Sequence, residues 1–187
     1  MKIHYPLIIG LLSIGCAQAV DTEQLTAESR DAVKALAAEL KAALQTSLKT
    51  EGPLKAVSVC NTQAPLLAEK VSAEKSMRVG RTSLKTRNDA NAPDAWEAAV
   101  LEQFEKRKAA GEAVTALEYS AITSDNGSRV FRYMKAIPAG DVCLVCHGQH
   151  IPDDLSTTLD ALYPNDKATG YNKGDIRGAF TVTRSIQ

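Results

Sequence analysis

The apolar periodicity of this chain changes along its length, and that change restricts the fold more than any other feature. Between residues 22 and 50 the large apolar side chains recur every three or four positions, which predicts one long amphipathic helix. These positions are Val33, Leu36, Leu40, Leu44 and Leu48. After residue 114 the apolar side chains alternate instead. In a chain of 187 residues this order predicts a single α+β domain, with helices first and an antiparallel sheet later.

Two further helices have sequence signals at their ends. Pro53 follows a glycine and is well placed to open a second helix that carries Cys60. Asp94 followed by Glu97 has the spacing of a capping box. This pair predicts a helix that runs to about Ala110.

The strands are expected in the second half of the chain. Residues 114–137 predict a β-hairpin with Asn126-Gly127 at its turn, and residues 175–186 predict a final strand. Residues 76–92 are rich in Arg, Lys, Asn and Thr. We expect a short strand at residues 77–79, followed by a long loop of the kind that often carries function.

The first 19 residues have the pattern of a Sec signal peptide. A lysine is followed by an apolar run over residues 7–14, and Ala17-Gln18-Ala19 matches a cleavage site. The apolar run is short for a membrane span, so we expect no stable span and a mature domain of residues 20–187 in the periplasm. A lipid anchor at Cys16 is the alternative, although the serine at position 13 is a poor match to a lipobox.

The charge balance argues against a nucleic-acid partner. Lys and Arg number 22 and Asp and Glu also number 22, so the chain lacks a basic footprint. The sequence also lacks the glycine-rich motifs that bind nucleotide phosphates.

The strongest chemical signal is the five-residue motif at residues 143–147. It places Cys143 and Cys146 two residues apart and His147 directly after them, the C-x-x-C-H sequence that attaches c-type haem. Two thiols on a tight turn can form thioethers with the two vinyl groups of one porphyrin. The next residue then lies beneath the iron and becomes an axial ligand. We therefore expect one covalent haem c, with the motif in a loop.

Other uses of this motif have less support in the sequence. A thioredoxin-like dithiol would place its first cysteine at a helix N-terminus, whereas a Pro-Ala-Gly-Asp segment precedes Cys143. A zinc site would need two more ligands, and only Cys60 and His150 remain in the mature chain. A disulfide across two intervening residues is strained.

The second axial position of the iron is open to several side chains. His150 lies three residues from His147, a reach of at most about 10 Å, which is too short to pass around a porphyrin. The remaining candidates are Met77, Met134, Cys60, a lysine or no ligand. Methionine is a common partner in electron-carrying cytochromes, whereas a buried methionine or cysteine often only fills core space.

Five sequence blocks resemble the Tll0287-like domain family (DUF3365) of exported haem c proteins and sensor domains. They are V-C-N-T-Q-A-P at 59–65, G-R-T-S-L-K-T-R-N at 80–88, N-A-P-D-A-W-E at 91–97, C-L-V-C-H-G at 143–148 and Y-P-N-D-K-A-T-G-Y-N-K-G-D-I-R-G-A at 163–179. The resemblance implies a PAS-like fold, with an antiparallel sheet flanked by helices, and a single covalent haem. It also implies that Cys60 is the axial ligand opposite His147. Thr86 departs from the proline expected at its position.

The basic loop has two interpretations. Its charges can form a solvated face, or its arginines can bind the haem propionates, because guanidinium matches carboxylate geometry. The resemblance favours the second interpretation for Arg81 and Arg87.

A haem held by His147 and Cys60 would have both axial positions filled, which argues against an oxygen carrier or a peroxidase. A thiolate, a dianionic porphyrin and ferric iron sum to zero charge, so a buried site disfavours the reduced anion and the reduction potential should be low. We expect a non-enzymatic electron-transfer protein with an unknown redox partner. The alternative is a sensor of redox state or of a diatomic gas that acts through a separate partner. Peroxidase activity is a weaker alternative.

Overall fold

The computed structural model describes residues 20–125 and 127–186. Both the signal peptide expected at residues 1–19 and the lipid anchor considered at Cys16 lie outside these residues. The α-helices are α1 (Thr22–Thr50), α2 (Pro53–Ser58), α3 (Ala64–Lys75), α4 (Ala95–Ala109), α5 (Asp141–His147) and α6 (Asp153–Leu162). The strands are β1 (Arg78–Thr82), β2 (Glu118–Asp125), β3 (Ser128–Pro138) and β4 (Ile176–Ser185). A π-helical turn, η1, covers Val59–Gln63, and two 3₁₀ turns, η2 and η3, cover Asp89–Asn91 and Val114–Ala116.

The strands form one antiparallel sheet in the order β1-β4-β3-β2, which confirms the α+β class. The expected hairpin is present as β2 and β3, which pair from Glu118↔Lys135 to Asp125↔Ser128. The first strand is longer than its sequence suggested. β1 continues through Arg81 and Thr82, because each of its residues pairs with a residue of β4, the strand beside it in the sheet.

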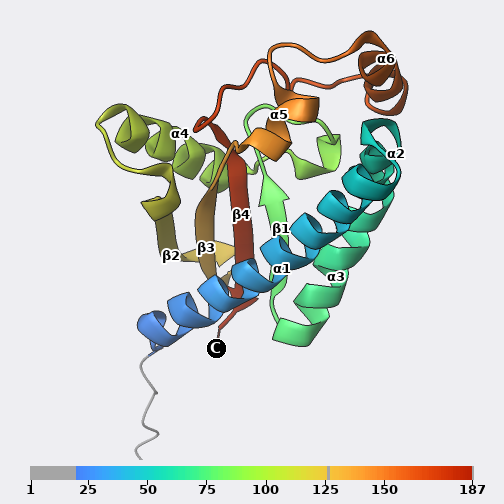
Figure 1. Ribbon diagram of the computed structural model, residues 1–187. Coiled ribbons are helices and arrows are strands. Elements are labelled where there is room, and N and C mark those ends of the chain that lie inside the picture. The colour runs from blue at the N-terminus through green and yellow to red at the C-terminus, as the bar shows by residue number, and fades with distance from the viewer. Residues whose placement is uncertain (1–19, 126, 187) are drawn as a thin grey trace, which may run out of the picture.

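Helices cover both faces of the sheet (Figure 1). On one face α1 and α3 pack against the strands through a core that includes Leu36, Val71, Phe131 and Val182. On the other face α4 packs through Phe104 and its apolar neighbours. The sheet is therefore the middle of three layers, as expected for an antiparallel sheet flanked by helices.

Local sequence signals account for several of the helix ends. The capping box at α4 is present, since the Glu97 amide donates to Asp94 and the Asp94 amide donates to Glu97. The helices α2 and α3 are joined through η1 without a break. Pro65 lacks an amide hydrogen, and the turn before it widens so that the Ala64 amide donates to Val59 five residues back.

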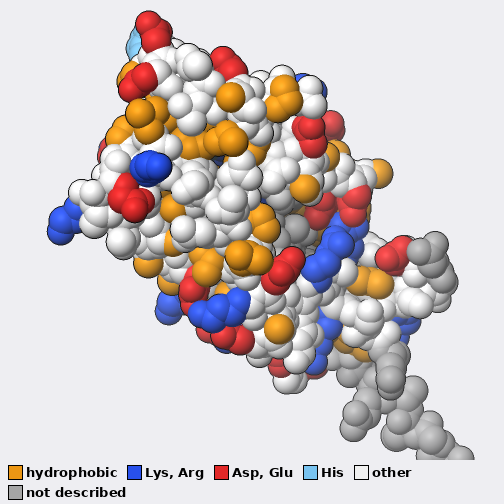
Figure 2. Space-filling view, turned by 90° about the vertical axis from the view of Figure 1, so that its right-hand side faces the viewer, with side chains coloured by type: hydrophobic (Ala, Val, Ile, Leu, Met, Phe, Trp, Pro, Cys, Tyr) orange, Lys and Arg blue, Asp and Glu red, His pale blue; other side chains and the backbone are white. Residues whose placement is uncertain are grey.

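One end of the sheet carries a cap made of α2, α5, α6 and the segment that leads to β4 (Figure 1). Val57 of α2 packs there against Leu155 and Leu159 of α6. Figure 2 shows hydrophobic side chains gathered in the upper half of the face formed by α2, α3 and α6. Within the described ranges, no helix has the length and apolar character needed to cross a membrane.

Candidate functional site

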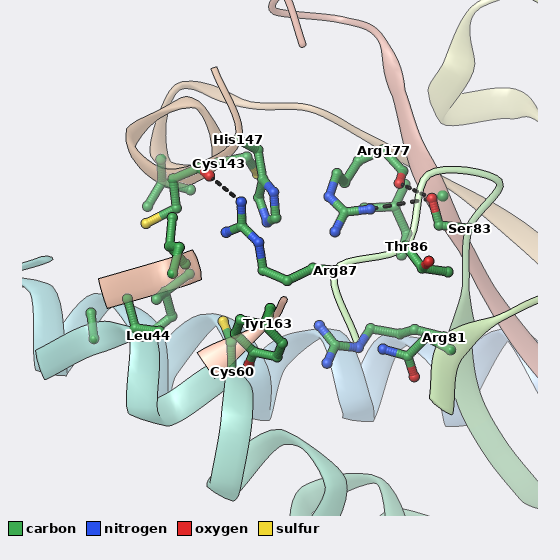
Figure 3. Close-up of a pocket in the computed structure, with 18 of the residues that line it drawn as sticks. Leu44, Cys60, Arg81, Ser83, Thr86, Arg87, Cys143, His147, Tyr163 and Arg177 are labelled. Atoms are coloured by element: carbon green, nitrogen blue, oxygen red, sulfur yellow. Dashed lines mark hydrogen bonds between the residues drawn. The ribbon is translucent and has the colours of Figure 1, made fainter. Parts of the chain in front are cut away.

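A pocket lies between the cap and the end of the sheet (Figure 3). Its walls come from the C-terminal half of α1, from α2 and η1, from β1 and the loop after it, from α5 and α6, and from the start of β4. The apolar stripe of α1 therefore has two roles, because Leu36 packs on the sheet whereas Leu44 and Leu48 line the pocket. All the site residues expected from the sequence line it: Cys60, Arg81, Arg87, Cys143, Cys146 and His147.

The C-x-x-C-H motif is helical rather than a loop, which corrects the sequence interpretation. It occupies α5, whose N-terminus is capped by Gly140. Residues three apart lie on one side of a helix, so both thiols face the pocket while Val145 between them stays 39% exposed. Cys143 thus lies in a first helical turn, the context of a thioredoxin-like dithiol. Burial raises the pKa of the Cys146 thiol.

His147 is held in one tautomer. Its Nδ1 lies 2.7 Å from the carbonyl oxygen of Ala168. Since a carbonyl can only accept, Nδ1 carries the hydrogen and Nε2 keeps its lone pair. The Tyr171 ring packs edge-on against the imidazole, with the two ring centroids 6.3 Å apart. The Tyr171 amide donates to the His147 carbonyl oxygen. A neutral imidazole with a second hydrogen-bonded nitrogen is the usual form of a metal-ligating histidine.

The surroundings of His147 also favour the neutral imidazole. Burial, together with the nearby cations of Arg177 and Arg87, lowers the pKa of His147 to about 2. The imidazole is therefore neutral across the physiological range, as a metal ligand must be.

Arg87 ties the motif to the segment that orients His147. Its Nε donates to Asp166 at 2.9 Å and its Nη2 donates to the Cys146 carbonyl oxygen at 2.6 Å. Asp166 in turn accepts from the Ala168 amide at 2.7 Å. Both side chains of the ion pair are over nine-tenths buried. The propionate contact expected for Arg87 stays a prediction, and the structure shows this arginine engaged with protein groups.

Cys60 approaches the pocket from the wall opposite His147 (Figure 3). It lies on the π-helical turn η1, and such turns often occur at functional sites. Its thiol interacts electrostatically with Arg81 and with Tyr163. Cys60, Cys143 and Cys146 are free thiols. The topology therefore brings a third thiol to the same pocket as the motif, from a position more than 80 residues earlier in the chain.

The other side chains considered as axial ligands lie elsewhere. Met77 and Met134 are buried in the two cores that pack on the faces of the sheet. His150 is exposed and does not line the pocket.

Sequence reasoning missed three contributors to the site. Asp166 and Ala168 position Arg87 and His147, and Arg177 lines the pocket beside them. The signal was present, because all three lie in the block at residues 163–179. Nothing local to that block shows which of its residues face the motif.

The fold and site define a class of small α+β domains in which two thiols, a neutral imidazole and a further thiol face one pocket. The chain belongs to the Tll0287-like family, whose model matches residues 17–185. A solved structure, the crystal structure of the cyanobacterial heme-protein Tll0287, matches with a TM-score of 0.67 and 25% sequence identity. That match covers 90% of this chain and 99% of the other chain. The search of curated proteins gave no match.

Proposed function

We propose that this chain is an exported haem-binding protein that carries one covalent haem c. The similar solved structure is of a heme-protein, and the family matches nearly the whole chain. The pocket fits such a group by its donor set. Cys143 and Cys146 would hold it through thioether bonds, and His147 and Cys60 would be the axial ligands. Export to the periplasm rests on the signal peptide expected from the sequence.

The observation that carries this proposal is the state of His147. Its Nδ1 hydrogen is given to Ala168, which leaves Nε2 free as a ligand directly beside two free thiols. Bound haem iron supplies one-electron redox chemistry. Of the chain's own groups, Tyr171 and Ala168 fix the imidazole, Arg87 fixes the motif, and the apolar wall of Leu44, Leu48 and Leu159 limits water.

Two variants test covalent attachment. We expect Cys143→Ala/Cys146→Ala to abolish covalent haem when the protein is exported together with a c-type maturation system. The measurements are a pyridine haemochrome assay and the intact mass of the mature chain. Cys60→Ala is the matched control, because it removes a pocket thiol outside the motif and should keep the haem attached. A wild-type mass equal to that of the bare polypeptide would refute the proposal.

Electron transfer with a separate protein partner is the role we propose for the haem. Apolar side chains near the attachment helix are exposed, including Val145, Leu54 and Leu162, and such a surface suits a transient protein contact. The chain is proposed as a carrier and not as an enzyme, since two protein ligands on the iron leave substrates no open position.

A redox or gas sensor that acts through a separate partner is the second candidate. The observation in its favour is the π-helical turn that carries Cys60, a backbone form that is frequent at functional sites. Loss of the Cys60 ligand on reduction could there be coupled to α2 and α3, which flank the turn. Titration of the reduced protein with CO or NO separates the two functions. Ligand displacement at low gas concentration supports the sensor, and an unchanged spectrum supports the carrier.

A further inference from the structure

Arg177 is directed to the pocket by an irregularity in β4. The pairing of β3 with β4 runs regularly to Ile137↔Gly178 and then shifts to Pro138↔Ile176. Arg177 is therefore the extra residue of a β-bulge, and bulges near functional sites re-aim a side chain. Gly178 makes this possible, because a Cβ at that position would lie 2.4 Å from the Thr82 carbonyl oxygen.

The guanidinium of Arg177 is held but not neutralised. Its Nη1 donates to Ser83 Oγ at 3.2 Å and to the Lys85 carbonyl oxygen at 3.3 Å, and its plane lies over the Tyr171 ring. The Nε group is buried and has no hydrogen-bond partner among the residues that the structure describes. A buried donor without an acceptor is unfavourable, so it marks a place where an acceptor is expected.

Arg81 also has no carboxylate partner among the described residues. Among the described residues its guanidinium appears in no ion pair and no hydrogen bond. It reaches the pocket from β1, and Figure 3 shows Arg81 and Arg177 extending toward the same space from different strands. No Asp or Glu is found among the described side chains that line the pocket. The two cations thus share a cavity whose described lining contains no carboxylate.

Arg87 differs from both, because its charge is matched by Asp166 and its Nη2 is used by the Cys146 carbonyl oxygen. Three arginines in one pocket therefore have two kinds of surroundings.

We propose that Arg177 and Arg81 together bind the two carboxylates of the cofactor, and that Arg87 is a positioning residue that holds the attachment helix. This inference rests on the proposed function, since the carboxylates are the propionates of the haem. It adds Arg177 to the site and gives Arg87 a different role from the one its sequence block suggested. Guanidinium groups bind carboxylates in a bidentate manner, which fixes the orientation of a planar dicarboxylate.

The first test uses the holoprotein with haem isotopically labelled at the propionate carboxyl groups. We expect the labelled carboxylate bands in the infrared spectrum to shift in Arg177→Gln and in Arg81→Gln. Arg78→Gln is the matched control, because Arg78 is an exposed arginine on the same strand as Arg81 and lies outside the pocket. Bands that shift only in Arg87→Gln would refute the proposal.

The second test does not depend on attachment. The full mature chain with Cys143→Ala/Cys146→Ala is titrated with haem and with haem dimethyl ester, whose carboxylates are blocked. A charged hydrogen bond contributes about 1.5–3 kcal/mol, so we expect the preference for the acid to fall about tenfold or more in Arg177→Gln and in Arg81→Gln. The affinity for the ester should stay the same, which separates lost recognition from lost folding. Equal acid preference in all variants would refute the inference.

The outcomes also separate this inference from the function on which it rests. A wild-type chain that binds no haem refutes both. A haem-loaded protein in which Arg177→Gln and Arg81→Gln behave like Arg78→Gln refutes the carboxylate assignment alone.

Discussion

The buried ion pair between Arg87 and Asp166 allows a quantitative test of how the site is built. We predict that Arg87→Met destabilises the protein by about 3–5 kcal/mol, the usual effect of removing one partner from a buried pair. The two side chains are only 7% and 8% exposed, so little solvent can reach the remaining Asp166 charge. The variant also removes the donor that the Cys146 carbonyl oxygen uses.

The predicted loss of stability comes from the buried Asp166 charge that is left without a partner, and a double variant isolates this cause. Asn at position 166 keeps an acceptor for the Ala168 amide but carries no charge. Arg87→Met/Asp166→Asn should therefore be more stable than Arg87→Met alone, although two residues have changed. Such coupling between contacting residues is typically 0.5–3 kcal/mol.

The assay is urea unfolding followed by far-UV circular dichroism, with all variants in the same haem state. Lys70→Met is the control, because Lys70 pairs with Glu39 on the surface, where both side chains are more than one-third exposed. An exposed pair of this kind contributes about 0–1 kcal/mol. The reasoning fails if Arg87→Met loses no more stability than Lys70→Met, or if adding Asp166→Asn deepens the loss.

Three further predictions address other parts of the molecule. Cys60→Ala should move the ferric EPR spectrum from a low-spin thiolate type toward high spin and raise the reduction potential; a wild-type spectrum would make Cys60 a core residue. The Arg30 cation, with the Tyr133 hydroxyl, lowers the pKa of Glu118 to about 2. After solvent screening, the ionised Glu118 should stabilise the folded protein by about 1–2 kcal/mol. This contribution should be complete above the ordinary glutamate pKa of about 4.5 and be lost as the pH falls toward about 2. Glu118→Gln should flatten that part of an acid-unfolding curve, and an unchanged curve would contradict the assignment. Phe104→Ala should lose about 3–5 kcal/mol in urea unfolding, because Phe104 is fully buried between α4 and the sheet; a loss below about 1 kcal/mol would contradict this packing.

The sequence alone determined the features that depend on residues close together in the chain. The capping box at Asp94 and Glu97 and the hairpin between β2 and β3 follow from contacts or turn preferences within a few residues. The long helix α1 follows from the same local periodicity. The spacing of Cys143, Cys146 and His147 is also local, which is why the attachment chemistry could be inferred without a structure.

Local patterns failed where an element is short or is stabilised by distant partners. The seven residues of α5 are too few for a helical period to be recognised. The strand expected at residues 77–79 continues to Thr82 because β4, about 100 residues later, pairs with it.

Only the tertiary structure decided which side chains share the pocket. Cys60 and Arg81 meet the motif because α2 and β1 end at the same edge of the domain, an arrangement that depends on packing between distant segments. Arg87 binds Asp166 across 79 residues, so its engagement could not be seen in its own sequence block. The direction of the Arg177 side chain depends on a bulge set by the register of β3 against β4. A register shift of one residue would turn this side chain to the other face of the sheet.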